Sequence, residues 1–220
     1  AQKITADLEL VKQKSHGAIN ANFFIFSPVS LPSESEVQCA VDALSALPMS
    51  QGVDYQIPSS PYYPDLEEML DPVWHYRPHW VTFHFGIPPS SVIDRAKQLK
   101  IAVGITATSV QEALEIQRAG ADAVIAQGIE AGGHRGIFDA DGADECMGID
   151  DLLKSMHGHL KIPVIAAGGL MTGHDIRRIQ LLGARAAQMG TAFLCCHESG
   201  ASSAHQRYLM QKNQLGTAYT

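Results

Sequence analysis

Several features that would assign this 220-residue chain to a membrane or nucleic-acid class are absent from its sequence. There is no run of about 18 apolar residues, the length that spans a bilayer. There is also no block of about five or more basic residues to attract nucleic acid or an anionic membrane, and the formal net charge is −7. Residues 1–10 alternate charged and apolar side chains, unlike the apolar core of a signal peptide. The sequence therefore predicts a soluble, cytoplasmic protein with small-molecule partners.

Metal-binding and disulfide patterns are also lacking. The cysteines form no C-x-x-C pair, so we expect them to be reduced and buried in the core. His75 and His79 lie in a proline-rich segment without an H-E-x-x-H pattern, and no metal site is predicted. The four cysteines are Cys39, Cys146, Cys195 and Cys196.

Two nucleotide-binding signatures are missing as well. No G-x-G-x-x-G spacing follows an early strand, as a dinucleotide-binding Rossmann sheet would show, and no Walker loop is present. An open doubly wound sheet of six strands remains an alternative on strand count alone. The glycine clusters instead follow the last three expected strands, where a (β/α)₈ barrel places its active-site and phosphate loops.

What the sequence does contain is an alternation of short β-rich runs and helical patterns, which is typical of a parallel α/β sheet. With 45% hydrophobic residues, the chain can bury a core as one domain. The expected strands cover residues 18–26, 80–85, 101–106, 123–127, 163–167 and 186–190.

One βα unit is marked twice along the chain. Ser109 can cap a helix, with Glu112 reaching back as in a capping box and Gly120 ending the helix. The same pattern returns 63 residues later (109 to 172), with Thr172 as the cap and Gly183 at the end. Two segments interrupt this rhythm: residues 28–79, rich in proline and aromatic side chains, and the acidic, glycine-bearing residues 128–161. We expect both to be long loops, which are often functional.

The most informative stretch is Gln127-Gly-Ile-Glu-Ala-Gly-Gly-His-Arg-Gly136, which begins where an expected strand ends. Glycine lets backbone N–H groups approach a flat or anionic ligand, so a cofactor is expected at the strand ends. This run resembles the signature of the nitronate monooxygenase family, formerly called 2-nitropropane dioxygenases.

Three further stretches resemble that family in the same order. Asn22-Phe-Phe resembles an asparagine-bearing strand, Val81-Thr-Phe-His-Phe-Gly86 resembles a second strand, and residues 163–169 precede Gln188-Met-Gly-Thr191 at the expected distance. The resemblance implies a TIM barrel that binds FMN and takes a nitronate or nitroalkane and oxygen as partners. It places the following residues around the FMN: Asn22, Gln127, Gly132, Gly169, Gln188, Met189, Gly190 and Thr191. A helix starting near Thr172 would offer its N-terminus to the phosphate.

His134 is the expected catalytic base. From the residues alone it is as readily a hydrogen-bonding loop histidine, but the family's base matches this position. The resemblance implies that it handles the proton on the carbon next to a nitro group. An imidazole suits this role because its ordinary pKa, about 6.5, lies near neutral pH.

The sequence also departs from the family pattern. The first two strands, with a Pro-Met turn and a glycine-rich second strand, are not found, and the tail after the last strand ends at Thr220. We therefore expect residues 1–220 to be a single partial barrel lacking its first two strands and its C-terminal tail. The unpaired edges of such a sheet favour a homo-oligomer.

Two other functions remain open. An FMN-dependent enoyl-acyl-carrier-protein reductase has a similar Gly-Gly-His turn, but its next residue is commonly apolar, whereas Arg135 stands here. A non-catalytic truncated fragment is the alternative from another class, and the missing strands are its sole support.

Overall fold

The computed structural model of the chain describes residues 1–50, 52–56 and 58–211, so the expected chain end at Thr220 lies outside the described residues. Six parallel strands form one curled sheet in the order β1-β2-β3-β4-β5-β6. The predicted parallel α/β sheet is confirmed, and each expected strand range overlaps an observed one. The strands are β1 (Asn20–Phe24), β2 (Trp80–His84), β3 (Ala102–Ala107), β4 (Ala123–Gln127), β5 (Val164–Ala167) and β6 (Ala186–Gln188).

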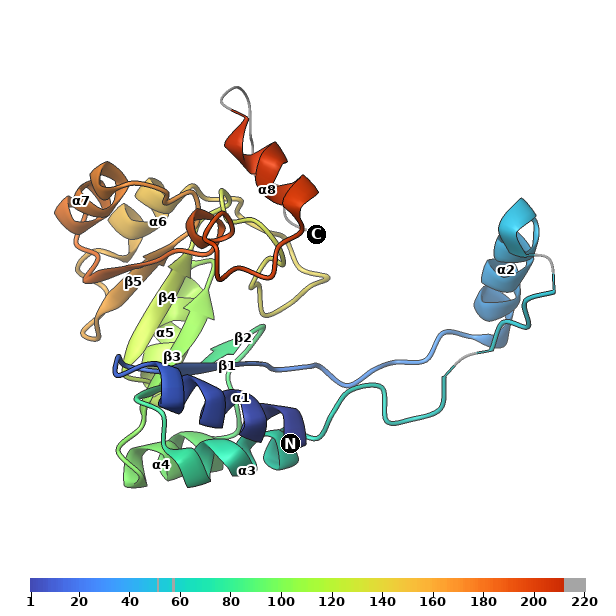
Figure 1. Cartoon of the computed structure of the whole chain (residues 1–220), viewed down its shortest axis with the longest axis horizontal. Helices are drawn as coiled ribbons and strands as arrows, with labels where there is room; N and C mark the ends of the chain where they lie inside the picture. Colours follow the sequence, from blue (N-terminus) through green and yellow to red (C-terminus); the bar gives the residue numbers. More distant parts are fainter. Residues whose placement is uncertain (51, 57, 212–220) are drawn as a thin grey trace.

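Helices follow the strands and cover one face of the sheet (Figure 1). Fully buried strand residues such as Phe83 and Ile105 point to this face and share one core with Ile93, Ile116 and Leu152 of the helices. Apolar burial of this kind is the main stabilising term of the fold. The helices are α1 (Gln2–Lys14), α2 (Glu34–Ser45), α3 (Leu66–Tyr76), α4 (Ser90–Gln98), α5 (Val110–Ala119), α6 (Ile149–Met156), α7 (Gly173–Leu181) and α8 (Ser203–Met210), with 3-10 turns η1 (Pro48–Ser50) and η2 (Thr191–Phe193).

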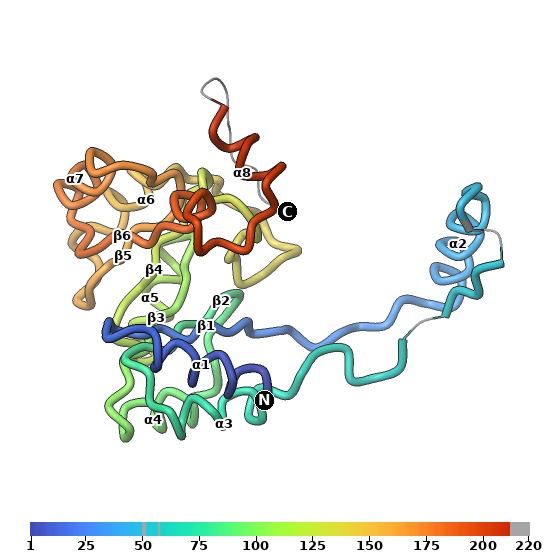
Figure 2. The backbone as a smooth tube through the Cα atoms, viewed as in Figure 1, coloured from blue at the N-terminus to red at the C-terminus, as the bar shows by residue number. Residues whose placement is uncertain are grey.

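The opposite face of the sheet, here called the open face, carries polar side chains. Because side chains alternate along a strand, the residues paired across the sheet share a face. Asn22 lies beside Thr82, and Gln127 lies beside Ala167, which lies beside Gln188. In the tube view the strands follow one another from β1 to β6 around this curled, half-barrel sheet (Figure 2).

The marked helix ends are largely as the sequence predicts. The Ser109 hydroxyl accepts a hydrogen bond from the Glu112 N–H, and Gly120 ends α5 in the left-handed conformation. At α7 the full capping box of Thr172 and Asp175 forms. The predicted capping box at α5 is wrong in its second half, because the Glu112 carboxylate accepts from the N–H and hydroxyl of Thr108 instead.

The segment 28–79 is not the plain loop that the sequence predicts, because it contains α2, η1 and α3. Its described residues between β1 and α3 form an arm that leaves the sheet after β1, carries α2 at its far end and returns to α3 (Figures 1 and 2). No α2 residue is buried, although Val37, Val41 and Leu44 recur at helical spacing. The structure therefore leaves an apolar stripe of α2 uncovered by the described part of the chain.

The cysteines are free, as predicted, but they are not core residues. Cys39, Cys146 and Cys196 are exposed and Cys195 is half-buried, because they lie on the arm and in loops outside the sheet. Within the described residues no helix has the length and apolar character needed to cross a membrane.

Candidate functional site

The loop of residues 128–148 crosses the carboxyl ends of the strands, and the Gln127 side chain holds its tip. The Gln127 Nε2 donates to the His134 carbonyl at 3.0 Å, and the Gly136 N–H donates to the Gln127 Oε1 at 2.7 Å. One buried amide thus fixes the backbone on both sides of Arg135. His134 takes its place from this bracket at the end of β4.

An ion pair between Arg135 and Asp144 connects two parts of the same loop. The Arg135 Nε and Nη2 donate to the two Asp144 carboxylate oxygens at 2.8 and 3.0 Å, and Nη1 donates to the Gln127 carbonyl at 2.6 Å. The Asp144 carboxylate also accepts from the Cys146 N–H at 2.9 Å. The hydrogen bonds from Arg135 hold the pKa of Asp144 below its ordinary value, against a smaller opposing effect of burial. The carboxylate is therefore charged at neutral pH.

Two glutamates hold the loop, one at its middle and one where it leads into α6. The buried Glu112 carboxylate, which is fixed to Thr108, also accepts from the Phe138 N–H at 2.8 Å. The Glu130 carboxylate accepts from the Ile149 N–H at 2.9 Å, where α6 begins. A carboxylate at a helix N-terminus is stabilised by the unpaired N–H groups and by the helix dipole.

The loop rests directly on the open face of the sheet at Gly136. A Cβ at this position would lie 2.6 Å from the His84 Cε1 and 2.7 Å from the Thr106 Cγ2, closer than real contacts allow. Only glycine lets the backbone lie this low. His84 and Thr106 support the loop here.

Aromatic rings surround the imidazole of His134, which is exposed. The Phe85 ring centroid lies 5.8 Å from that of His134, and the Phe24 ring centroid lies 6.4 Å away. Phe85 has a positive φ of 73°, a costly conformation for a residue other than glycine and one that recurs at functional sites. Within the described residues no hydrogen bond joins the His134 imidazole, and His134 lines a pocket beside these rings.

His84 lies under this cluster and differs from His134 in its environment. Burial lowers the pKa of His84 below its ordinary value. A weaker opposing effect comes from its hydrogen bond with the His134 carbonyl, where the Nε2 lies at 3.4 Å. At neutral pH His84 is uncharged and can donate one N–H to that carbonyl.

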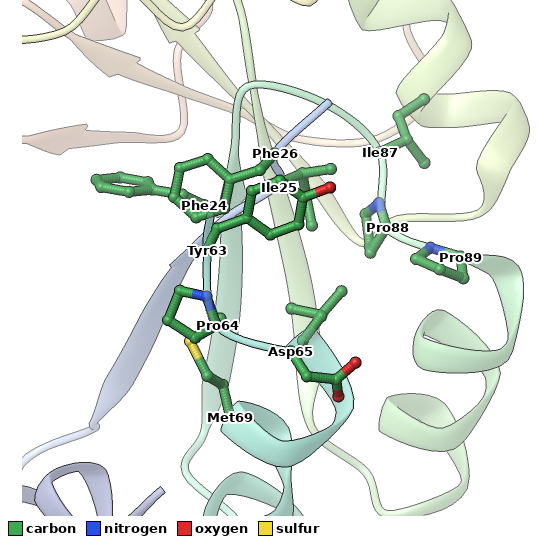
Figure 3. A pocket seen from close by; sticks show the side chains of 11 residues that line it. Phe24, Ile25, Phe26, Tyr63, Pro64, Asp65, Met69, Ile87, Pro88 and Pro89 are labelled. Atoms are coloured by element: carbon green, nitrogen blue, oxygen red, sulfur yellow. The ribbon is translucent and has the colours of Figure 1, made fainter. Parts of the chain in front are cut away.

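A pocket of about 540 Å³ opens in front of His134. Its walls come from the end of β1, from Phe85 and from the loop, including Phe138 and Asp144. A second pocket of about 510 Å³ lies beyond Ile25 and Phe26, which border both pockets. Figure 3 shows the second pocket, with Phe26 stacked on Tyr63 at a centroid distance of 5.2 Å. Both pockets are mainly apolar, which suits small organic molecules.

Further residues singled out by the sequence lie along the open face and at the ends of β5 and β6. The Asn22 Oδ1 accepts from the Thr82 hydroxyl at 3.0 Å, and Gln188 is exposed at the end of β6. A Cβ at Gly190, or at Gly173 in the first turn of α7, would meet nothing within 4 Å. This end of the sheet therefore leaves room for a ligand beside the first turns of α7 and η2.

Gly168 and Gly169 lie against the loop after β4. A Cβ at Gly169 would lie 2.8 Å from the Glu130 Cβ, and one at Gly168 would lie 2.9 Å from the Ala131 nitrogen. The loop after β4 fills this space. At α7 the Asp175 carboxylate already accepts from the N–H groups of Met171 and Thr172, so the room for an anion lies at Gly173 and beyond.

Comparisons with known proteins agree with this geometry. A family model described as nitronate monooxygenase matches residues 2–220. The chain belongs to the nitronate monooxygenase family.

The relatives and solved structures cover between two thirds and all of the chain. A nitronate monooxygenase of Pseudomonas aeruginosa is 36% identical over 100% of the chain and 63% of its own length. One of Paraburkholderia phytofirmans is 44% identical over 66% of the chain and 39% of its own length. A nitroalkane oxidase from Streptomyces ansochromogenes superposes with a TM-score of 0.78 at 32% identity, over 94% of the chain and 59% of that structure. FabK from Thermotoga maritima gives 0.67 at 25% identity, over 95% and 52%. The chain thus spans about two fifths to three fifths of the length of these proteins.

Against this family background, the structure groups some of the expected site residues and separates others. His134, Gln127 and Gly132 lie on or beside the loop after β4, and the segment Gln188, Met189, Gly190 and Thr191 leads from β6 into η2. Asn22 lies on β1, at the opposite edge of the described sheet from β6. The role of His134 as the base stays a prediction. The roles as FMN contacts also stay predictions for Asn22, Gln127, Gly132, Gly169, Gln188, Met189, Gly190 and Thr191.

Sequence reasoning missed the residues that hold the loop. The sequence predicts only a long acidic loop around Asp144, and it assigns Arg135 no partner within the chain. Nothing in the pattern distinguishes Asp144 from Asp139 or Asp141 as the partner of Arg135. The arginine directly after His134, with acidic residues close behind, was the available signal for an ion pair.

Proposed function

We propose that this chain is part of an FMN-dependent nitronate monooxygenase, which oxidises alkyl nitronates with molecular oxygen and uses His134 as its catalytic base. The observation that carries the proposal is the exposed imidazole of His134, held at the tip of a clamped loop in front of an apolar pocket. Family membership supports the reaction class.

The open face and the ends of β5 and β6 fit a flavin. Asn22 and Gln127 offer amide groups on the open face, and Gln188, Met189, Gly190 and Thr191 would hold the phosphate end with Gly173 nearby. Gly169 supports this arrangement indirectly, by letting Glu130 pack against it, and Gly132 keeps the loop free of a side chain beside His134. When bound, FMN accepts electrons from the nitronate and passes them to oxygen.

Transfer of the substrate proton is the step that this chain's own residues carry out. A neutral nitroalkane loses a proton from the carbon next to the nitro group, and the His134 imidazole can accept it because it lines the pocket and has no hydrogen-bond partner within the described residues. Phe24 and Phe85 beside the imidazole offer an apolar surface to the alkyl group. Fixing the backbone of His134 through Gln127 pre-organises the base.

We further propose that residues 1–220 form one domain and that the six strands belong to an eight-stranded TIM barrel. The curled parallel sheet and the 59% coverage of the Streptomyces structure support this view. Strands completing the barrel would pair with the free sides of β1 and β6.

The experiment uses the protein with its natural upstream sequence. Heat release and chromatography of the cofactor should yield FMN. Anaerobic addition of an alkyl nitronate should then bleach the flavin absorbance, whereas NADH or NADPH should not. Bleaching by a nicotinamide and not by the nitronate would favour the reductase alternative, and bound FAD or the absence of any flavin would contradict the proposal.

A further inference from the structure

The imidazole of His134 has no hydrogen bond within the described residues, so the loop backbone and the neighbouring rings of Phe24 and Phe85 set its position. The Gln127 amide holds the carbonyl of His134 from one side, and His84 lies against the same carbonyl. What keeps the next residue in place therefore also determines where the imidazole stands.

Arg135 is that next residue, and its side chain is used entirely inside the loop. Its side chain is 6% exposed, and three of its nitrogens donate to Asp144 and to the Gln127 carbonyl. The bond to the Gln127 carbonyl ties the loop back to the end of β4, and the two bonds to Asp144 tie it to the stretch before α6. The two residues thus connect two parts of the loop, and we call the Arg135–Asp144 ion pair the staple.

A role in binding an anionic substrate does not fit Arg135. A paired guanidinium with 6% of its side chain exposed has little surface to offer, and Asp144, 18% exposed, already neutralises its charge. Asp144 and Arg135 both line the pocket in front of His134. The ion pair therefore connects the residue next to the base with the pocket wall.

We propose that the Arg135–Asp144 ion pair is a positioning device that holds the His134 imidazole at the distance and angle at which it removes the substrate proton. The proposal rests on the proposed function, because it takes His134 as the base. Arg135 and Asp144 act as positioning residues, because their charged groups are bonded to each other and to the Gln127 carbonyl. Small displacements of a base are costly: about 1 Å can lower the rate about 100-fold.

The test compares Asp144→Asn with Asp151→Asn in the protein with its natural upstream sequence. Both changes remove one carboxylate charge, but Asp151 pairs with Lys154 on the surface of α6, where the side chains are 72% and 60% exposed. Arg135→Lys is the second variant, because it keeps the positive charge and loses the two-pronged geometry.

Two readouts are combined. Hydrogen–deuterium exchange reports the amides of residues 128–148, and steady-state kinetics reports kcat and KM for a neutral nitroalkane and for its pre-formed nitronate. Asp144→Asn and Arg135→Lys should speed exchange in the loop and lower kcat on the neutral nitroalkane by about tenfold or more. KM and kcat on the nitronate should change less, flavin content should persist, and Asp151→Asn should behave as wild type.

Other results separate the two hypotheses. Unchanged exchange and kinetics in both variants would overturn the staple, and so would equal losses on both substrate forms, which indicate general damage to the site. Faster loop exchange in a protein whose wild type oxidises no nitronate would contradict the proposed function while leaving the staple intact.

Discussion

At the scale of single residues, the site separates side chains that are free to act from side chains that are already engaged. The imidazole of His134 lines a pocket. The polar side-chain atoms of Gln127 and Arg135, in contrast, form hydrogen bonds with backbone groups and with Asp144. The same division applies to the glycines: Gly190 faces open space, and Gly169 faces Glu130. Substitutions at these positions should therefore have distinct effects.

Replacing His134 by asparagine should separate catalysis from cofactor binding. FMN should remain bound, because no proposed flavin contact is removed. Activity on a neutral nitroalkane should fall by about 10² to 10⁴-fold, the contribution of a general base. Activity on the pre-formed nitronate should fall less, since that substrate has already lost its proton. Oxygen uptake with each form measures this, and equal losses on both would show that His134 is not chiefly a base.

The two glycines allow a matched test of the phosphate site. Gly190→Leu should fold with nearly unchanged thermal stability, because the residue has a negative φ of −109° and open space around it, yet it should lose flavin. Gly169→Ala should destabilise the protein whether or not flavin is present, because Gly169 has a φ of +63° and the added Cβ would lie 2.8 Å from the Glu130 Cβ. Flavin absorbance and melting temperature are the readouts. A yellow Gly190→Leu protein would place the phosphate elsewhere.

At the scale of elements, the loop after β4 gains its order from side chains that lie far from it in sequence or at its ends. Glu112 belongs to α5 and Glu130 caps α6, while Asp144 returns to Arg135. This explains how a glycine-rich loop of about twenty residues can hold one geometry.

The loop should also give the protein a defined acid sensitivity through Asp144. Its pKa in the folded protein is held below that of the unfolded chain, chiefly by Arg135. Its stabilising effect is therefore present above the unfolded value, about 3.9, and is lost as the pH falls through the folded value. Melting temperatures of wild type and Asp144→Asn should differ most at neutral pH and converge on acidification below about pH 4. A constant difference down to that range would contradict the assignment.

The elements show which parts of the fold a sequence can predict. Strand positions and the caps Ser109 and Thr172 followed from local patterns, because alternation and capping depend on neighbouring residues. The partner of the Glu112 carboxylate did not follow, since Phe138 approaches only after the chain folds. The pairing of Arg135 with Asp144 could not be predicted for the same reason.

The candidate site divides in a similar way. The placement of His134 beyond a strand end could be predicted from the glycine-rich run and the family resemblance. The packing of Glu130 against Gly169 could not, because it joins the loops after two different strands. The helix in the arm was missed although its signals are local, because Ser33 and Glu36 form a capping box and apolar residues follow at helical spacing.

At the scale of the whole molecule, the chain has features that favour association. β1 and β6 are the edges of the described sheet, and the arm leaves Leu31, Leu47 and Met49 exposed. Unpaired edges and exposed apolar side chains invite contacts between copies.

Residues 1–220 alone should therefore self-associate. A protein extended with its natural upstream sequence should be monodisperse, because added strands would pair with the open edges. Size-exclusion chromatography of both proteins measures this difference. A monodisperse 220-residue monomer with a cooperative melting transition would favour an open sheet over a barrel.

The central claim is that the extended protein oxidises nitronates by itself, with FMN as its cofactor and oxygen as the electron acceptor. The most direct measurement is oxygen uptake by the purified extended protein when an alkyl nitronate is added without any nicotinamide cofactor. The account predicts steady oxygen consumption that follows the nitronate concentration and depends on bound FMN. Flavin-loaded protein that consumes no oxygen with the nitronate would contradict it.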